Sequence, residues 1–358
     1  MEQHYSQQRV QKAASHLYWT AWMIFVIALC IGIWVGTLLL HVEGCNTLIS
    51  KEGLHSPDNL KQGNNISSIH LESWSPPDEH TIPTNEKGEL IRYGKELIVH
   101  TSVYLGPKGS VRKMSNGMNC QNCHLEAGTK PFGNNYSAVA STYPKFRQRS
   151  GSVETISKRI NDCFERSLNG QSLDTTSHEM RAMVAYMQWL GSNVKKGVKP
   201  EQAGLPELVP MNRAAEPENG KLLYKQHCLV CHGVKGQGVL AVGGKEYQFP
   251  PLWGNHSYNN GAGLYRLSRM AGYVKANMPF GVSFYKPLLS DEDAWDLAAY
   301  INTMPRTDIR KGTMLHDWPD IAGKPFDHPF GPFTDSFSEK QHKYGPYEPI
   351  MASHKKTK

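Results

Sequence analysis

The chain has no long run of basic residues and only a modest share of apolar ones. Its 39 Lys and Arg against 32 Asp and Glu give a net charge of +7, spread along 358 residues. Proteins that bind nucleic acid usually gather their basic residues in one patch, so we expect no nucleic-acid partner. Small anions or acidic proteins are better suited as partners of a mildly positive protein. Apolar residues make up 39% of the chain, which is low for the two or three packed domains that its length suggests.

One long apolar run stands near the start of the chain, at 17–40, and contains no charged residue. At about 1.5 Å per residue it is long enough to cross a bilayer as a helix. Arg9 and Lys12 precede it, which favours a cytoplasmic N-terminus. No Ala-x-Ala cleavage site follows, so we expect a single-pass anchor in the inner membrane; lipidation at Cys45 and ordinary signal cleavage are the alternatives. All three place the bulk of the chain outside the cytoplasm, in the periplasm of a bacterium.

Two copies of the pattern Cys-x-x-Cys-His carry the strongest signal. They are Cys120-Gln-Asn-Cys123-His124 and Cys228-Leu-Val-Cys231-His232. In c-type cytochromes the two cysteines bind the haem vinyl groups and the histidine ligates the iron. A zinc site would need two more ligands at matching spacing, and a thioredoxin-like redox pair is the other alternative. The sequence therefore predicts two covalently bound haem c groups, which also supply apolar core that the composition does not count.

The residues around the two motifs form an internal repeat of about 110 residues. A short helical pattern precedes each motif, starting at Tyr93 and at Asn219. Another helix follows much later, at 183–187 and at 297–301. We expect the aromatic residues of these closing helices to be core contacts with the first helix of each repeat and not redox relays.

The closing helices have clear start signals. Thr176 with Glu179, and Ser290 with Asp293, each match the spacing of a capping box.

The predicted fold is all-α, with two tandem cytochrome c domains. The expected segments are a cytoplasmic N-terminus at 1–16, a transmembrane anchor at 17–41, a periplasmic linker at 42–88, cytochrome c domain 1 with the catalytic haem at 89–196, a linker at 197–214, cytochrome c domain 2 with the electron-transfer haem at 215–306 and an irregular C-terminal extension at 307–358. Four aromatic residues of the extension favour docking over disorder: Trp318, Phe326, Phe330 and Phe333.

A haem iron with one histidine needs a sixth ligand or keeps an open site. In the second repeat Met278 is the candidate, because Pro279 biases it away from helix and onto an extended loop. A methionine thioether raises the haem potential. Met270 and Lys275 are the alternatives.

The matching region of the first repeat has no Met-Pro but holds Cys163 at a similar offset from its motif. A thiolate ligand there would depress the haem potential strongly. Cys163 could instead be a buried structural thiol or form a disulfide with Cys45. His178, Met180 and Met183 would then compete for the iron.

Two arginines and a serine stand close to Cys163. Arg159 and Ser167 are each four residues away and share its face on a helix, and Arg149 lies upstream. Guanidinium groups near a thiol favour its thiolate form, and they offer paired donors to oxyanions. Each arginine could instead be a solvated surface charge. This alternative is weaker here, because the arginines flank a free cysteine in a haem domain.

With these residues in view, the chain resembles the thiosulfate dehydrogenases, which are periplasmic dihaem c-type cytochromes, over roughly 88–350. The stretches that carry the resemblance lie at 119–125, 159–167, 276–281, 316–320 and 327–331. The stretch around Cys163 is the most discriminating, because ordinary cytochromes c lack it. The membrane anchor departs from the soluble members of the family and affects location more than chemistry.

The resemblance implies that His124 and Cys163 are the axial ligands of haem 1, the catalytic haem. It implies that Arg149, Arg159 and Ser167 line the substrate pocket.

The resemblance also implies that haem 2 passes electrons outward. Some members use a lysine next to a methionine on this haem. Here Asn277 precedes Met278, so ligation by His232 and Met278 is the better expectation.

The expected reaction couples two thiosulfates to tetrathionate, with electrons passed to a soluble or membrane-bound c-type cytochrome or another acceptor. Arg149 and Arg159 can supply the positive charge that two dianions need to meet. Cys163 would release the iron, or bond to the sulfane sulfur of one thiosulfate, which the second then attacks. Tetrathionate reduction would use the same site.

Two other classes of protein are alternatives to an enzyme of this kind. A membrane-tethered dihaem electron carrier without its own substrate is the main alternative, but a carrier needs neither Cys163 nor the arginines. A haem sensor would need an output domain, for which the chain has no room.

Overall fold

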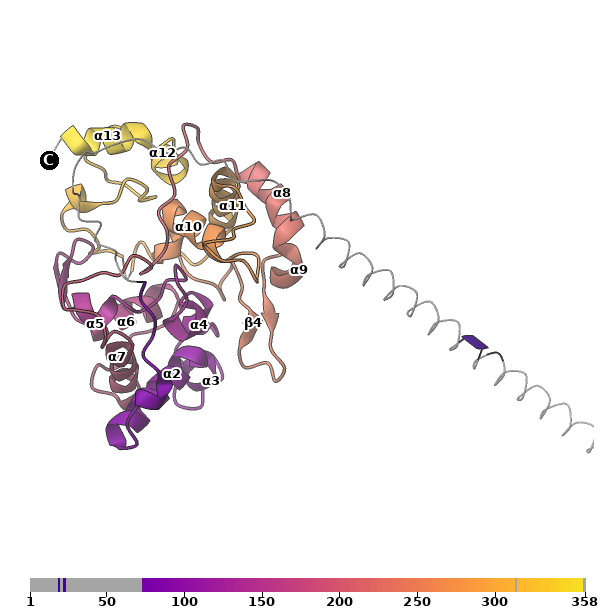
Figure 1. Cartoon of the computed structure of the whole chain (residues 1–358). Helices are drawn as coiled ribbons and strands as arrows, with labels where there is room; N and C mark the ends of the chain where they lie inside the picture. The colour runs from indigo at the N-terminus through magenta and orange to yellow at the C-terminus, as the bar shows by residue number, and fades with distance from the viewer. Residues whose placement is uncertain (1–18, 20–21, 24–72, 313, 357–358) are drawn as a thin grey trace, which may run out of the picture. The chain divides into compact units, whose positions relative to one another are not determined.

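The computed structural model describes residues 19, 22–23, 73–312 and 314–356. The chain divides into two compact units, Met1–Ser68 and Ile69–Lys358, and the second holds both Cys-x-x-Cys-His motifs. Within it, a first helical module (indigo to magenta) lies beside a second one (salmon to orange), and the C-terminal helices (yellow) lie against the second (Figure 1).

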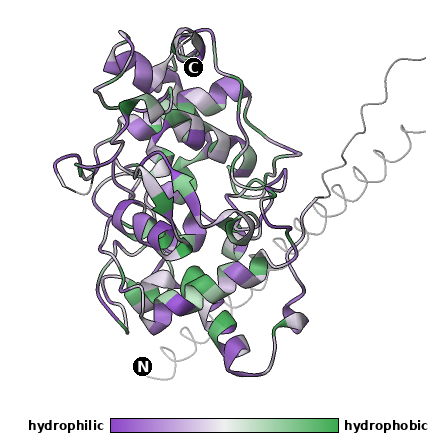
Figure 2. Ribbon diagram, turned by 90° about the vertical axis from the view of Figure 1, so that its left-hand side faces the viewer, coloured by the Kyte–Doolittle hydropathy of each residue, from purple (hydrophilic) through white to green (hydrophobic). Residues whose placement is uncertain are grey.

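The first module consists of short helices and one hairpin. Its elements are η1 (Glu79–Thr81), α2 (Glu86–Val99), α3 (Thr101–Leu105), η2 (Cys120–Asn122), α4 (Leu125–Gly128), α5 (Val139–Thr142), β1 (Lys145–Arg147), β2 (Ser152–Glu154), α6 (Ile156–Arg166) and α7 (His178–Leu190). The helices of the protein carry both apolar and polar residues, as expected of helices that bury one face (Figure 2).

The second module repeats this plan, and the extension follows it. Its elements are α8 (Pro217–His227), α9 (Leu229–His232), β3 (Val239–Leu240), β4 (Tyr247–Phe249), η3 (Gly263–Tyr265), α10 (Leu267–Asn277) and α11 (Asp291–Thr303). The extension holds η4 (Ile321–Gly323), α12 (Glu339–Tyr344) and α13 (Glu348–Lys356).

The described chain is helical but not purely so. Strand β1 pairs antiparallel with β2, and β3 pairs antiparallel with β4, each pair forming a two-stranded sheet. Each hairpin follows the Cys-x-x-Cys-His motif of its module. The all-α prediction missed both hairpins because strands of two or three residues leave too little period-two pattern to detect.

The internal repeat has the same helix crossing in both modules. Helix α2 packs on α7, and α8 packs on α11. A Cβ atom on Gly94 would lie 2.0 Å from the backbone oxygen of Ala182, and one on Gly220 would lie 2.0 Å from that of Asp296. Each crossing therefore needs a glycine, because the two backbones approach too closely for any side chain.

The tyrosines of the closing helices lie at these crossings. The Cβ atoms of Tyr186 and Tyr300 would each be 2.8 Å from a Cβ on Gly94 and Gly220 respectively. Tyr186 is 1% exposed, and its hydroxyl donates to the carbonyl oxygen of Ala127 at 3.0 Å. The prediction that these aromatic residues contact the first helix of each repeat is confirmed.

One of the two predicted helix caps is displaced by one residue. Ser177, not Thr176, caps α7, and its side chain accepts a hydrogen bond from the Met180 amide. The capping box of Ser290 and Asp293 at the start of α11 is present as predicted. Thr176 fails as the cap because its hydroxyl bonds to the side chain of Asp174 at 2.8 Å instead.

The segment before α2 and the C-terminal extension both pack on the modules. Trp74 is buried, and its indole nitrogen donates to Asn193 at 3.0 Å. In the extension, Tyr347 and Ile350 are buried, with the Tyr347 ring 5.4 Å from that of Trp295.

The aromatic residues of the extension dock as expected. Phe330 stacks on Tyr265 at 5.8 Å, and the guanidinium of Arg149 faces the ring of Trp318 at 5.7 Å. The extension is less irregular than predicted, because it ends in α12 and α13. Their few turns are stabilised by burial and not by a helical pattern that the sequence displays.

The two modules meet at the first Cys-x-x-Cys-His motif. The hydroxyl of Tyr273 on α10 donates to the carbonyl oxygen of Asn122, between the two cysteines of that motif, at 2.7 Å. Asn277, the last residue of α10, donates to the carbonyl oxygen of Phe132 at 3.1 Å. Helix α10 therefore links the first haem motif to Met278, which follows it directly.

The predicted single-pass anchor at 17–41 has to be corrected. Among the residues that the structure describes, no helix is both long and apolar enough to span a membrane. Inner-membrane localisation is therefore not supported. Of the predicted anchor, the structure describes only residues 19, 22 and 23. The rest of it, which includes Cys30, lies outside the described residues, and so does Cys45.

Candidate functional site

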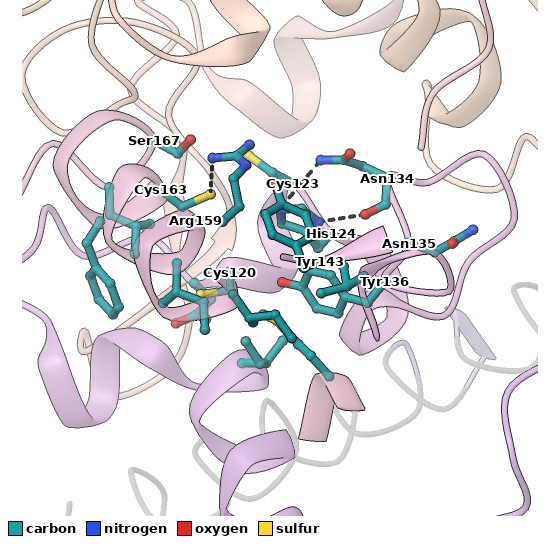
Figure 3. A pocket seen from close by; sticks show the side chains of 18 residues that line it. Cys120, Cys123, His124, Asn134, Asn135, Tyr136, Tyr143, Arg159, Cys163 and Ser167 are labelled. Atoms are coloured by element: carbon teal, nitrogen blue, oxygen red, sulfur yellow. Dashed lines mark hydrogen bonds between the residues drawn. The ribbon is translucent and has the colours of Figure 1, made fainter. Parts of the chain in front are cut away.

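Both cysteines and the histidine of the first motif line one cavity together with Cys163 (Figure 3). About 880 Å³ of space in this cavity is free of protein atoms, part of it open to solvent. That volume lies in the range typical of small-molecule and cofactor sites. The rest of the wall is largely apolar: Ile98, Val139, Ile156, Ile160, Phe164, Leu168 and Met187 contribute to it. Two thiols, an imidazole and an apolar wall are the set of groups that a covalently bound haem needs.

The imidazole of His124 is oriented for ligation of a metal. Its Nδ1 lies 2.6 Å from the carbonyl oxygen of Asn134, which can only accept, so Nδ1 carries the proton. The other ring nitrogen, Nε2, is then left with its lone pair and lies 3.5 Å from the side-chain nitrogen Nδ2 of Asn134. Burial lowers the pKa of His124 to about 4, so the ring is neutral, as a metal ligand must be.

The buried thiols argue against a thioredoxin-like redox pair. Burial raises the pKa of both Cys120 and Cys123 to about 12, whereas reactive redox cysteines need a depressed pKa. The described part of the chain contains no group of three His, Cys, Asp or Glu residues arranged to hold a metal ion.

Helix α6 carries the residues that were expected around the thiol. Thr155 caps its start by accepting from the Lys158 amide, and Ser167 is its C-terminal cap. Nη1 of Arg159 donates to Sγ of Cys163 at 3.3 Å, one helical turn apart. The charge of Cys163 is the main cause that raises the pKa of Arg159, so the guanidinium stays cationic beside the sulfur.

Cys163 reaches the cavity and its rivals do not. It is a free cysteine in the structure, with no disulfide. Met180 and Met183 are fully buried and do not line the cavity, and His178 stacks on Tyr93 at 5.2 Å instead. Arg159 and Ser167 line the cavity with Cys163.

Arg149 is placed differently from Arg159. It does not line the cavity, and its Nη1 donates to the carbonyl oxygen of Gly261 at 3.0 Å. Its Nε lies 3.9 Å from Oδ2 of Asp317, and its own carbonyl oxygen accepts from the Trp318 amide at 2.6 Å. Burial and then the charge of Arg166 lower the pKa of Arg149 to about 10, so it stays cationic at neutral pH.

A buried ion-pair network at the base of α6 was not predicted. Arg166 donates to Asp162 at 2.7 Å and to Asp317 of the extension at 2.8 Å. The spacing of Asp162 and Arg166 on a helix could have revealed the first pair. Nothing in the sequence pattern marks Asp317 as its second partner, because the two residues are brought together only when the extension docks.

The second motif has the same histidine geometry as the first. His232 is buried, and its Nδ1 lies 2.8 Å from the carbonyl oxygen of Pro250, which leaves Nε2 for a metal. Burial raises the pKa of Cys228 to about 12. Met278 has extended backbone angles directly after α10, as predicted, and packs against the core.

Models of two protein families match the chain. The SoxA/TsdA cytochrome c domain matches residues 110–195, and the cytochrome c family matches residues 217–305. Each matched range contains one Cys-x-x-Cys-His motif. The chain therefore has two cytochrome c domains and holds two c-type haems.

Three similar proteins are thiosulfate dehydrogenases. The one from Psychrobacter arcticus is 39% identical over 68% of this chain and 71% of its own length. Those from Stutzerimonas stutzeri and Allochromatium vinosum are each 37% identical, over 65% and 64% of this chain and 73% and 83% of their own lengths.

A solved structure with a similar fold carries the same name as these three relatives. Thiosulfate dehydrogenase (TsdBA) from Marichromatium purpuratum, in its as-isolated form, is 34% identical and matches 64% of this chain with a TM-score of 0.59. The match spans 49% of that protein's length. By these similarities, together with its two haem motifs, the chain belongs to the thiosulfate dehydrogenase family.

Proposed function

We propose that two thiosulfates are coupled to tetrathionate in the cavity at Cys163, and that the second haem site passes the electrons on to another redox protein, such as a c-type cytochrome. One observation carries this proposal: Cys163 is a free thiol that shares a cavity with a haem attachment motif and accepts a hydrogen bond from Arg159 at 3.3 Å. An electron carrier without a substrate would need neither group.

The residues present fit two haems with unequal tasks. His124 and Cys163 would hold the iron of the first, and His232 and Met278 that of the second. When bound, the haems supply the redox chemistry by taking up the two electrons of the oxidation, and a thiolate ligand lowers the potential of the first relative to a methionine ligand on the second.

Cys163 is suited to sulfur exchange because a thiolate is both a nucleophile and a leaving group. An S–S bond first forms between the Cys163 thiolate and the sulfane sulfur of one thiosulfate, with loss of two electrons. The sulfane sulfur of a second thiosulfate then attacks the sulfane sulfur of this adduct. The bond to Cys163 breaks, its thiolate leaves, and tetrathionate is released without uptake or loss of a proton.

Arg159 stabilises the charge that builds up in this sequence. Each thiosulfate is a dianion, so the approach of two of them to a thiolate is opposed by Coulomb repulsion. A guanidinium in a largely apolar cavity offsets this repulsion more strongly than it would in water. Ser167 lines the same cavity and offers a hydroxyl to a sulfonate oxygen. The same groups serve tetrathionate reduction, in which every step is reversed.

The test is an anaerobic assay of the purified dihaem protein with thiosulfate and ferricyanide, in which tetrathionate is quantified, and a reverse assay with tetrathionate and a reduced donor. Cys163→Ala is expected to keep both haems, as measured by pyridine haemochrome content, and to lose thiosulfate oxidation. Met180→Leu is the matched control, because it alters a buried residue that does not line the cavity, and it should keep activity. An active Cys163→Ala protein would contradict the proposed mechanism.

A further inference from the structure

A second cation lies beside a residue of the cavity wall. Nζ of Lys145 lies 4.9 Å from the centroid of the Tyr143 ring, and Tyr143 lines the cavity. Lys145 is half-buried at the start of β1, whose pairing with β2 fixes the backbone at this point. The contact with Tyr143 places its ammonium group next to the cavity wall.

Lys145 forms no ion pair with a carboxylate in the part of the chain that the structure describes. Glu154, its neighbour across the hairpin, lies 3.8 Å from Nε of Arg147 instead. Burial, and then the like charges of Arg147, Arg159 and Lys199, lower the pKa of Lys145, and the charge of Glu154 offsets part of this effect. The single carboxylate of Glu154 stands against several cations, so the excess of positive charge around Lys145 favours the binding of an anion.

The positive charge of Arg147, a neighbour of Lys145 on β1, is partly balanced by Glu154. Its Nε lies 3.8 Å from Oε2 of Glu154, a carboxylate that is almost fully buried. Lys145 is therefore a half-buried cation next to the cavity wall, whereas Arg159 lines the cavity itself.

The product has a matching distribution of charge. Tetrathionate carries one sulfonate at each end of a chain of two sulfane sulfurs. With one sulfane sulfur next to Cys163, the sulfonate of that half can reach Arg159. The other half has to extend away from Cys163, toward the opening of the cavity, and its sulfonate needs a second cation.

We propose that Lys145 forms an outer anion subsite for the sulfonate of the second thiosulfate, and later for the outward end of tetrathionate. This inference rests on the proposed function. It adds the group that receives the attacking dianion, which neither Arg159 nor Ser167 supplies.

The test is the Lys145→Gln variant of the dihaem protein. Loss of one cation that acts on a dianion across part of the cavity should raise KM for thiosulfate roughly three- to tenfold, with a smaller change in kcat. The rise of KM with ionic strength should become less steep, because one screened attraction has been removed. Lys145→Arg keeps the charge and should restore KM. Lys221→Gln, on α8 of the second module, removes an exposed charge as a matched control and should leave KM unchanged.

An equilibrium measurement separates this subsite from turnover. In a Cys163→Ala background, calorimetric titration with tetrathionate should show affinity reduced by a similar factor when Lys145→Gln is added. Unchanged KM, salt dependence and affinity would overturn the outer subsite while leaving the proposed function intact. A fall in kcat and haem content without a rise in KM would also overturn it, because it would indicate a structural role. Failure of the unaltered protein to oxidise thiosulfate would instead overturn the proposed function.

Discussion

The guanidinium of Arg159 and the sulfur of Cys163 are joined by a hydrogen bond of 3.3 Å across one turn of α6. The pair faces the cavity that both cysteines of the first haem motif line. A helix with a capped start places the two side chains on one face, so their contact follows from local geometry. Their functional setting does not, because the haem motif comes from a different part of the chain.

Arg159→Gln is expected to keep both haems and to lower kcat/KM for thiosulfate by about 100- to 1000-fold. The cation that stabilises the thiolate and the incoming dianion is lost, and such preorganised charges contribute on the order of that factor. Steady-state assays with ferricyanide measure the loss. Arg112→Gln, an exposed arginine of the same module, is the control. A loss of less than about threefold would show that Arg159 is not part of the catalytic charge arrangement.

Asp317→Ala is expected to destabilise the protein by about 2–3 kcal/mol. Arg166 donates to Asp317 at 2.8 Å in a buried position, and the substitution removes this charged hydrogen bond and leaves Asp162 as the remaining partner of Arg166. Denaturant unfolding of the holoprotein measures this loss. Asp320→Ala removes only an exposed cap of η4 and should cost about 1 kcal/mol. Equal costs for the two variants would refute the role of Asp317.

Met278→His is expected to lower the potential of the second haem by on the order of 100 mV, because an imidazole stabilises ferric iron more than a thioether does. Spectroelectrochemical titration of both haems makes the measurement. The potential of the first haem should stay unchanged. Met270→Leu, a buried change within α10, is the control and should leave both potentials unchanged. If Met270→Leu shifts the potential and Met278→His does not, the ligand is wrongly assigned.

Gly94→Ala and Gly220→Ala are each expected to destabilise the protein by about 3 kcal/mol or more, because the added Cβ would lie 2.0 Å from a backbone oxygen and the helices must separate. Gly263→Ala is the matched control, since a Cβ there meets no atom within 4 Å. Thermal and denaturant unfolding compare the three variants. A mild effect at Gly94 and a severe one at Gly220, or the reverse, would mean that the two crossings are not equivalent.

His328 is expected to make the protein less stable in acid. Burial, with smaller contributions from Lys324, Arg149 and Arg266, lowers the pKa of His328 to about 3. The unfolded chain binds a proton near pH 6.5 and the folded chain does not, so stability is full above that pH and is lost as the pH falls toward 3.

The measurement is the free energy of unfolding between pH 7 and pH 4. In this window the unaltered protein should lose up to about 1.4 kcal/mol per pH unit more than His328→Gln does. His256→Gln, at an exposed histidine, should behave like the unaltered protein. Parallel pH profiles for the His328→Gln variant and the unaltered protein would refute the assignment.

Local sequence patterns predicted much of the first module. The Cys-x-x-Cys-His motifs marked haem attachment, because covalent bonding to a haem demands that spacing. The four-residue intervals from Arg159 to Cys163 and from Cys163 to Ser167 predicted a shared helix face, and α6 provides it. Helix caps were less certain, since Thr176 and Ser177 are adjacent and only the fold decides which one bonds to the helix.

The predictions that failed depend on distant contacts or on segments with weak patterns. The membrane anchor rested on hydropathy, flanking basic residues and the lack of a cleavage site, and no described helix supports it. Helices α12 and α13 escaped detection because burial against the second module stabilises them, as at Ile350. The short hairpins were missed for a similar reason.

The sequence by itself determined the two haem motifs, the glycines that match at the two helix crossings and the arginine, cysteine and serine of α6, because covalent chemistry and helical periodicity act over a few residues. Only the tertiary structure decided what these groups face. It turned Arg149 toward Asp317 and Trp318, buried Arg166 between two aspartates, and set Lys145 beside Tyr143 of the cavity wall. Those positions depend on where the extension and the first hairpin dock, and docking is decided by packing and charge pairing between residues far apart in the chain.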